Sequence, residues 1–176
     1  MKLTTACEKI DAMRRLDVGV FTSTDLTFLF HETGIKLKKT VAQLVKHGKL
    51  IRATRGIYVH ATPPIIDHVR QRIVLSLRGS KAFTYVSLEC ALHRHQLITQ
   101  VPTALTLMTT GRSARLDTPF GLIELRHTQR SVSDLYRRTQ MVDGPLPWAD
   151  QALAIQDANR SGRAQDLLLD YQQQYG

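Results

Sequence analysis

The residues best suited to bind a partner lie in one basic stretch of the chain. Between positions 36 and 55 there are seven Lys or Arg residues, and between Thr33 and Ile66 there is no Asp or Glu. Cationic side chains without acidic neighbours can neutralise the phosphates of a polyanion. We therefore expect this segment to bind nucleic acid, with a solvated basic face as the alternative.

A helix that begins just after Gly34 would carry these cations on one side. Leu37, Val41, Leu44 and Val45 recur at helical intervals, which predicts an apolar stripe facing a core. The remaining positions combine lysines, which neutralise phosphates, with Thr and Gln, which can read base edges by hydrogen bonding. The helix residues that we expect to bind DNA are Lys36, Lys38, Lys39, Thr40, Gln43 and Lys46.

Two short β-prone runs follow this helix and predict a hairpin. Gly48 lies where a left-handed helix cap is needed, and the runs Leu50 to Ala53 and Ile57 to Val59 come after it. Arg52 and Arg55, in and beside the turn of the hairpin, would reach the DNA backbone or the minor groove. A helix followed by a basic hairpin is typical of a winged helix-turn-helix.

The residues before the basic helix supply the other expected parts of such a domain. Thr5 to Leu16 has helical spacing, and Val20-Phe21 fits the short edge strand of a wing. A second helix is expected from Asp25 to about Phe30, because the Thr and Ser residues before Asp25 offer an N-cap.

Ala61-Thr62-Pro63-Pro64 interrupts the pattern, because proline lacks a backbone donor and fixes φ. We place a domain boundary there, which gives a winged domain at 1–62 and a second domain at 63–176. Charge is uneven between the two, since residues 1–62 hold 11 Lys or Arg against 5 acids within a chain of net charge +9. The basic partner surface is therefore expected in the first domain.

The second domain is expected to mix helices and strands, so the whole chain is assigned to the α+β class. A helix from Ile65 to Leu77 precedes a strand at Phe83 to Val86, and Ser87 is expected to cap a further helix that ends near Gln96. Three β-prone runs predict an antiparallel meander, and three helices are expected after it. The runs are Ala104 to Thr110, Arg115 to Thr118 and Leu122 to His127; the helices are 133–140, 148–159 and 163–175.

Two constellations suggest metal chemistry, and each has an ordinary explanation that we favour. Cys90, His93 and His95 lack a fourth ligand at zinc spacing, so they are expected to be ordinary helix residues. Asp117 and Glu124 fit the paired acids of a metal-dependent nuclease, but Arg126 takes the place of the lysine, and a guanidinium cannot act as a base. Charge pairing across a hairpin is the simpler interpretation. We expect no metal, no cofactor and no catalysis.

The chain has two cysteines far apart, Cys7 and Cys90, which do not indicate a disulfide framework. Its first 16 residues lack the apolar core of a signal peptide, and no stretch approaches the length of about 18 apolar residues that a membrane-spanning helix needs. These features predict a soluble, cytoplasmic protein without a membrane partner.

Taken in order, several motifs resemble the AbiEi-type antitoxins of bacterial toxin-antitoxin and abortive infection systems. The less specific motifs are those that any winged regulator can show: 21–26 (FTSTDL), 44–52 (LVKHGKLIR) and 55–58 (RGIY). The more specific ones come later: 85–92 (YVSLECAL), 108–112 (MTTGR), 127–128 (HT) and 146–149 (LPWA).

The resemblance implies a DNA-binding repressor of its own operon, whose C-terminal domain acts as antitoxin beside a nucleotidyltransferase-like toxin. Its DNA partner would be a double-stranded operator with inverted repeats. Two alternatives stay open: a stand-alone winged-helix regulator with a sensory second domain, and a nuclease that uses Asp117 and Glu124.

Overall fold

The computed structural model describes residues 1–62 and 66–163, and it has the α+β fold that the sequence predicts. The chain divides into two compact units, residues 1–77 with 118–120, and residues 78–117 with 121–176. Pro63 and Pro64, where the sequence predicts a domain boundary, lie outside the described residues. The boundary at that position therefore stays a prediction.

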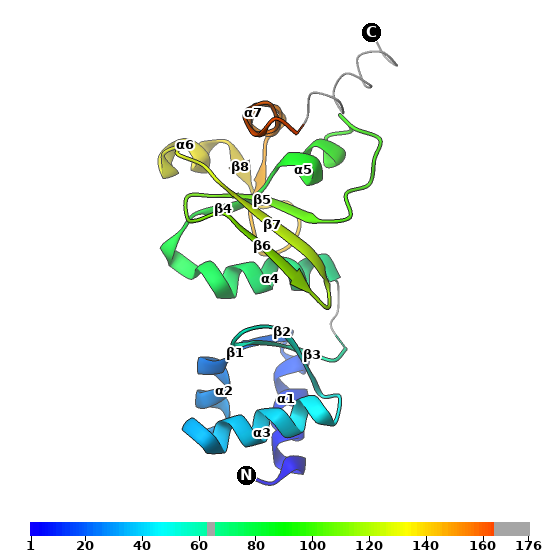
Figure 1. Cartoon of the computed structure of the whole chain (residues 1–176), viewed down its shortest axis with the longest axis vertical. Coiled ribbons are helices and arrows are strands. Elements are labelled where there is room, and N and C mark those ends of the chain that lie inside the picture. Colours follow the sequence, from blue (N-terminus) through cyan, green and yellow to red (C-terminus); the bar gives the residue numbers. More distant parts are fainter. Residues whose placement is uncertain (63–65, 164–176) are drawn as a thin grey trace. The chain divides into compact units, whose positions relative to one another are not determined.

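The first unit has the three helices and the small sheet of a winged helix-turn-helix (Figure 1). Helix α1 is Leu3–Arg15, α2 is Ser23–Phe30 and α3 is Gly34–Lys46. The strands are β1 (Val20–Thr22), β2 (Leu50–Thr54) and β3 (Ile57–His60), paired antiparallel in the order β1-β3-β2. All of these elements are expected from the sequence.

Local chemistry fixes the start and end of α2. The Thr22 hydroxyl accepts a hydrogen bond from the Asp25 backbone N–H, and the Asp25 carboxylate accepts one from the Thr22 N–H, which forms a capping box. The helix ends at His31, whose φ of 53° reverses the chain toward α3. The two helices of the helix-turn-helix are thus joined by a tight left-handed turn.

A single apolar cluster holds α1, α2, α3 and the strands together. Ile10, Phe21, Leu26 and Leu44 are each no more than 1% exposed. Burial of side chains of this size stabilises a fold by about 1.5 to 3 kcal/mol each. Helix α4 (Ile66–Arg78) follows in the chain and belongs to the first unit as far as Leu77.

The second unit is built on a six-stranded sheet with the order β6-β7-β5-β4-β9-β8. Its strands are β4 (Thr84–Val86), β5 (Leu105–Thr109), β6 (Ala114–Thr118), β7 (Gly121–His127), β8 (Thr139–Gln140) and β9 (Trp148–Ala149).

The expected antiparallel meander is wrong, because β5 pairs parallel with β7 while β6 lies at the edge of the sheet. Burial explains this order. Every residue of β5 is buried, so the strand needs neighbours on both sides, and β4 and β7 provide them. Strand β6 exposes Arg115 and Asp117, and charged side chains suit an edge strand because they discourage pairing with other chains.

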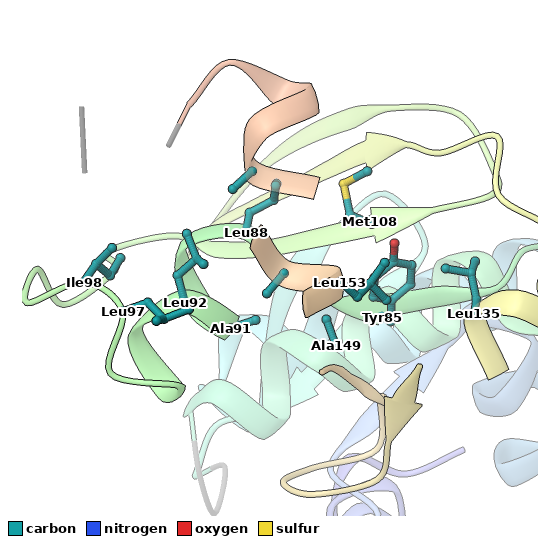
Figure 2. Close-up of a cluster of buried hydrophobic side chains, with 12 residues drawn as sticks. Tyr85, Leu88, Ala91, Leu92, Leu97, Ile98, Met108, Leu135, Ala149 and Leu153 are labelled. Carbon is teal, nitrogen blue, oxygen red and sulfur yellow. The ribbon is translucent and has the colours of Figure 1, made fainter. Parts of the chain in front are cut away.

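Helices α5 (Leu88–Arg94), α6 (Val132–Arg137) and α7 (Gln151–Ser161) complete the second unit. Figure 2 shows its core, in which Leu88 and Leu92 of α5 and Leu153 of α7 gather beside Tyr85 and Met108 of the sheet.

Three local expectations for this unit are wrong. Ser87 precedes α5, but its hydroxyl donates to Asp157 and makes no cap bond to the helix. Trp148 and Ala149 form strand β9 rather than the first turn of a helix. Helix α7 begins at Gln151, because Asp150 is its N-cap and accepts a hydrogen bond from Leu153 N–H. The expected helix 133–140 ends at Arg137, because Thr139 and Gln140 pair with β9. The helix expected at 163–175 falls almost wholly outside the described residues.

None of the helices in the described part of the chain is long and apolar enough to cross a membrane.

Candidate nucleic-acid interface

Helix α3 presents a basic face that the fold leaves open. Val41 and Leu44 are buried in the core of the first unit, and Leu37 packs against it. The helix residues Lys36, Lys38, Lys39, Gln43 and Lys46 are all exposed. The apolar stripe thus fixes the orientation of the helix, and the cations are carried on its outer side. Val45, expected in the stripe, is instead 37% exposed at its margin.

The lysines of α3 form no salt bridge within residues 1–62 and 66–163, although the charge of Lys36 helps to lower the pKa of Glu32. Two other lysines of this unit are used internally. Lys9 donates to the Leu29 carbonyl at 2.7 Å, and Lys49 donates to the Asp11 carboxylate at 3.2 Å. Exposed lysines that form no salt bridge are available to contact phosphates.

Thr40 does not belong to this face. Its side chain is 9% exposed, and its hydroxyl donates a 2.6 Å hydrogen bond to Oε2 of Glu32. The expectation that Thr40 reads base edges is therefore wrong, because Thr40 lies at the edge of the buried stripe and its donor is already used. The sequence pattern places Thr40 on a flank of the helix, between the apolar stripe and the basic face. Whether a side chain at such a position is buried depends on tertiary packing.

Glu32 holds the turn that precedes α3. One carboxylate oxygen accepts from Thr40, and the other accepts from the N-terminal ammonium of Met1 at 2.6 Å. The hydrogen bond from this ammonium, followed by the one from Thr40, lowers the pKa of Glu32. The residues just before α3 are thereby tied both to the second turn of α3 and to the N-terminus, which precedes α1.

The hairpin of β2 and β3 places the two arginines that the sequence singles out. Arg52 and Arg55 are both exposed, and Arg55 lies in the turn before Gly56, whose φ is +77°. The Gly56 carbonyl accepts a 2.9 Å hydrogen bond from Ser23 N–H. This bond fixes the tip of the wing to the first residue of α2, so that wing and helix-turn-helix form one rigid surface.

Residues 8–60 match the family model described as transcriptional regulator, AbiEi antitoxin. Over these residues the first unit is similar to the AbiEi antitoxin family of transcriptional regulators. The match covers α2, α3, the wing and most of α1, and it confirms the resemblance drawn from motifs 21–26, 44–52 and 55–58. No curated protein matches the chain.

The second unit contains a buried carboxylate on α7. Asp157 is 1% exposed, and its Oδ2 accepts 2.8 Å hydrogen bonds from the hydroxyls of Tyr85 and Ser87. The Arg130 guanidinium lies 3.5 Å from Oδ1. Burial raises the pKa of Asp157 in spite of these partners, and burial with the neighbouring Asp157 raises the pKa of Tyr85. This network joins α7 to β4, a contact that the sequence did not reveal.

Beside it lies a cleft of about 700 Å³ with a basic lining, formed by β6, β7 and the end of α7. Its cations are Arg115, Arg126, Arg160 and Arg163. Glu124 accepts a short hydrogen bond from Arg163 and lies 3.7 Å from Arg115. The Arg163 guanidinium lowers the pKa of Glu124. Two of the four arginines thus pair with Glu124, and Asp157 also lines the cleft, so its excess of positive charge comes from Arg126 and Arg160.

The two metal constellations do not assemble. Both carboxylate oxygens of Glu124 are engaged by arginines, while Asp117 is exposed on β6. The Cys90 thiol contacts the Ala104 carbonyl, and the His95 imidazole contacts the Ala149 carbonyl. No group of three or more metal-binding side chains is found among the residues that the structure describes.

Proposed function

We propose that this protein is a DNA-binding antitoxin and the repressor of its own toxin-antitoxin operon. The observation that carries the proposal is the basic outer face of α3, which the fold leaves exposed in a domain similar to the AbiEi regulator family. The proposed DNA-binding residues are Lys36, Lys38, Lys39, Gln43 and Lys46 of α3 with Arg52 and Arg55 of the wing.

In this proposal α3 enters the major groove and the wing follows the neighbouring backbone. The lysines neutralise phosphates, which gives affinity without sequence information. Gln43 has the amide geometry that pairs with the N6 and N7 edge of adenine, so it contributes specificity. Arg52 and Arg55 reach phosphates or the minor groove from the wing.

The proposed division of labour follows a boundary at Pro63-Pro64. A domain as small as residues 1–62 offers few phosphate contacts, so stable repression needs two copies on inverted half-sites. Residues 63–176 would supply the antitoxin role against a nucleotidyltransferase-like toxin, as the resemblance implies. We assign the protein no catalysis of its own, because its most nuclease-like acid, Glu124, is neutralised by arginine.

The test is a binding titration with the DNA that lies upstream of the protein's own gene. We expect a footprint with two related half-sites, and binding at least 10³-fold tighter than to a scrambled duplex of equal length and composition. Equal affinity for the two duplexes would contradict operator binding. Growth rescue of cells that express the adjacent gene tests the antitoxin role.

The cleft in the second unit favours a second candidate, a winged-helix regulator that senses a small anion. Its volume of about 700 Å³ falls within the range of ligand-binding pockets. A regulator of this kind would change its operator affinity when the anion is added and would not need a toxin gene nearby. The gene next to this one separates the two candidates.

A further inference from the structure

The outer face of α3 contains an apolar residue that contributes nothing to the core. Ile35, the second residue of the helix, is 72% exposed and is absent from the apolar cluster of the first unit. A β-branched residue at an exposed helix position has a lower helix propensity than Ala, Lys or Gln. Folding therefore gives no reason for isoleucine at this position.

The neighbours of Ile35 on the outer face of α3 indicate what kind of surface its side chain can contact. At helical spacing, Lys38, Lys39 and Ala42 lie three, four and seven residues after Ile35, and all three are exposed. The face thus has apolar side chains along its middle and lysines beside them. A single exposed apolar side chain is ordinary on a protein surface. An apolar side chain with exposed lysines on both sides, however, is complementary to an apolar group that lies between phosphates.

The major groove of DNA offers one such group, the C5-methyl of thymine. A recognition helix contacts base edges mainly with its N-terminal residues, and Ile35 is in the first turn of α3. Because Thr40 is buried, the groups on this face that can favour A·T pairs are the Gln43 amide and the apolar side chains, whereas the lysines contact phosphates or guanine. The Gln43 amide suits adenine, so both kinds of group favour A·T pairs.

We infer that Ile35 is a specificity-determining residue that contacts a thymine methyl group in each operator half-site. The inference rests on the proposed DNA-binding function and adds to it the identity of the base pair that the first turn of α3 reads. Ala42 lies about 10 Å further along the helix axis. It therefore meets a different base pair, and its small side chain lets the helix approach the groove closely.

The test replaces thymine by uracil, which removes the methyl group and leaves base pairing intact. Full-length protein first selects its preferred site from a pool of random 30-base-pair duplexes. The selected duplex is then made in two forms, one with thymine and one with uracil throughout, and dissociation constants are measured by fluorescence anisotropy at one salt concentration. We expect the wild-type protein to bind the thymine form about fourfold more tightly for each methyl that it buries.

The variant Ile35→Ala should lose this preference for thymine. Its affinity for the uracil duplex should equal that of the wild-type protein, so the two effects are not additive. Leu16→Ala is the matched control, because Leu16 is also 72% exposed but follows α1. It should keep the wild-type ratio of the two dissociation constants. Lys39→Ala should weaken binding to both forms equally.

Three results would overturn the inference while leaving the DNA-binding function intact. These are an equal affinity of wild-type protein for both duplexes, an unchanged thymine preference in Ile35→Ala, and a change of oligomeric state in Ile35→Ala by sedimentation. The last result would mean that Ile35 serves self-association. Failure of the random pool to yield any enriched sequence would instead overturn the proposed function and the inference together.

Discussion

The hydroxyl of Thr40 donates a 2.6 Å hydrogen bond to the Glu32 carboxylate, which joins the second turn of α3 to the residue two positions before the helix. This bond gives Thr40 a structural role in place of the base-reading role that its position in the sequence suggests.

Thr40→Val should therefore weaken the fold without changing DNA recognition. Valine keeps the shape of threonine but leaves one oxygen of Glu32 without its donor. We expect a melting temperature lower by a few degrees, measured by circular dichroism, and an unaltered preference for operator over scrambled DNA in competition titrations. Gln43→Ala provides the contrast, since it should relax the same preference by about 1 to 3 kcal/mol. A loss of discrimination in Thr40→Val would restore Thr40 as a reader.

Lys39→Ala and Lys46→Ala should each weaken binding to operator and random DNA by the same factor. Phosphate contacts carry little sequence information, and each lost contact should reduce the slope of log K against log salt by about 0.9. The matched control is Lys49→Ala, because Lys49 is paired with Asp11 and should leave the salt slope unchanged. Loss of sequence discrimination at an unchanged slope would contradict the phosphate role of Lys39 and Lys46.

The sequence predicts the first unit well because its elements are specified locally. The apolar spacing of α3, the capping box of Thr22 and Asp25 and the left-handed Gly48 are all readable from neighbouring residues. Thr40 was misassigned because it lies at the margin of the stripe, where burial depends on the position of Glu32 rather than on periodicity.

The second unit is harder to predict because its decisive contacts are long-range. Asp157 accepts hydrogen bonds from Tyr85 and Ser87, which are 72 and 70 residues away in the sequence, and no local sequence pattern predicts these contacts. Strand order has the same difficulty. Propensity identifies β5, β6 and β7 as strands, but only the burial of β5 on both faces decides that β7 lies beside it.

Asp157→Ala should be among the most destabilising single changes in the second unit. It leaves the hydroxyls of Tyr85 and Ser87 and the guanidinium of Arg130 without their shared acceptor in a buried site. Losses of this kind cost about 3 to 5 kcal/mol. Asp134→Ala is the matched control, since Asp134 contacts the same Arg130 at 3.9 Å but is 36% exposed, and it should cost less than about 1 kcal/mol. Urea denaturation of both variants gives the comparison, and equal losses would contradict a central role for Asp157.

The ion pair of Glu124 and Arg163 should make stability depend on pH in the acid range. Because Arg163 lowers the folded-state pKa of Glu124 below its ordinary 4.5, the pair contributes fully above pH 4.5 and its contribution is lost as the pH falls through the folded-state pKa. Glu124→Gln should therefore be less stable than wild type at pH 7, and the difference should shrink steadily below pH 4.5. Asp117→Asn, on the exposed edge of β6, should follow the wild-type profile. A constant difference between Glu124→Gln and wild type from pH 7 to pH 3 would exclude a charge-dependent role for the pair.

Full-length protein with Lys36, Lys39 and Lys46 all changed to alanine should separate repression from toxin suppression. The three lysines are exposed and form no salt bridge within the described residues, so their loss should leave the fold intact while it removes three phosphate contacts and flattens the salt dependence by about 2.7 in slope. We expect the variant to fail to repress a reporter under its own promoter. In cells that express the toxin from a separate inducible plasmid it should still rescue growth, because the proposed antitoxin role resides in residues 63–176.

Melting curves and soluble yield of the triple variant must match those of wild type. The Lys49→Ala protein serves as a control, because it loses a lysine that pairs with Asp11 within the protein. Rescue by wild type and Lys49→Ala but not by the triple variant would mean that toxin suppression depends on DNA binding, and the proposed division of labour would then be wrong.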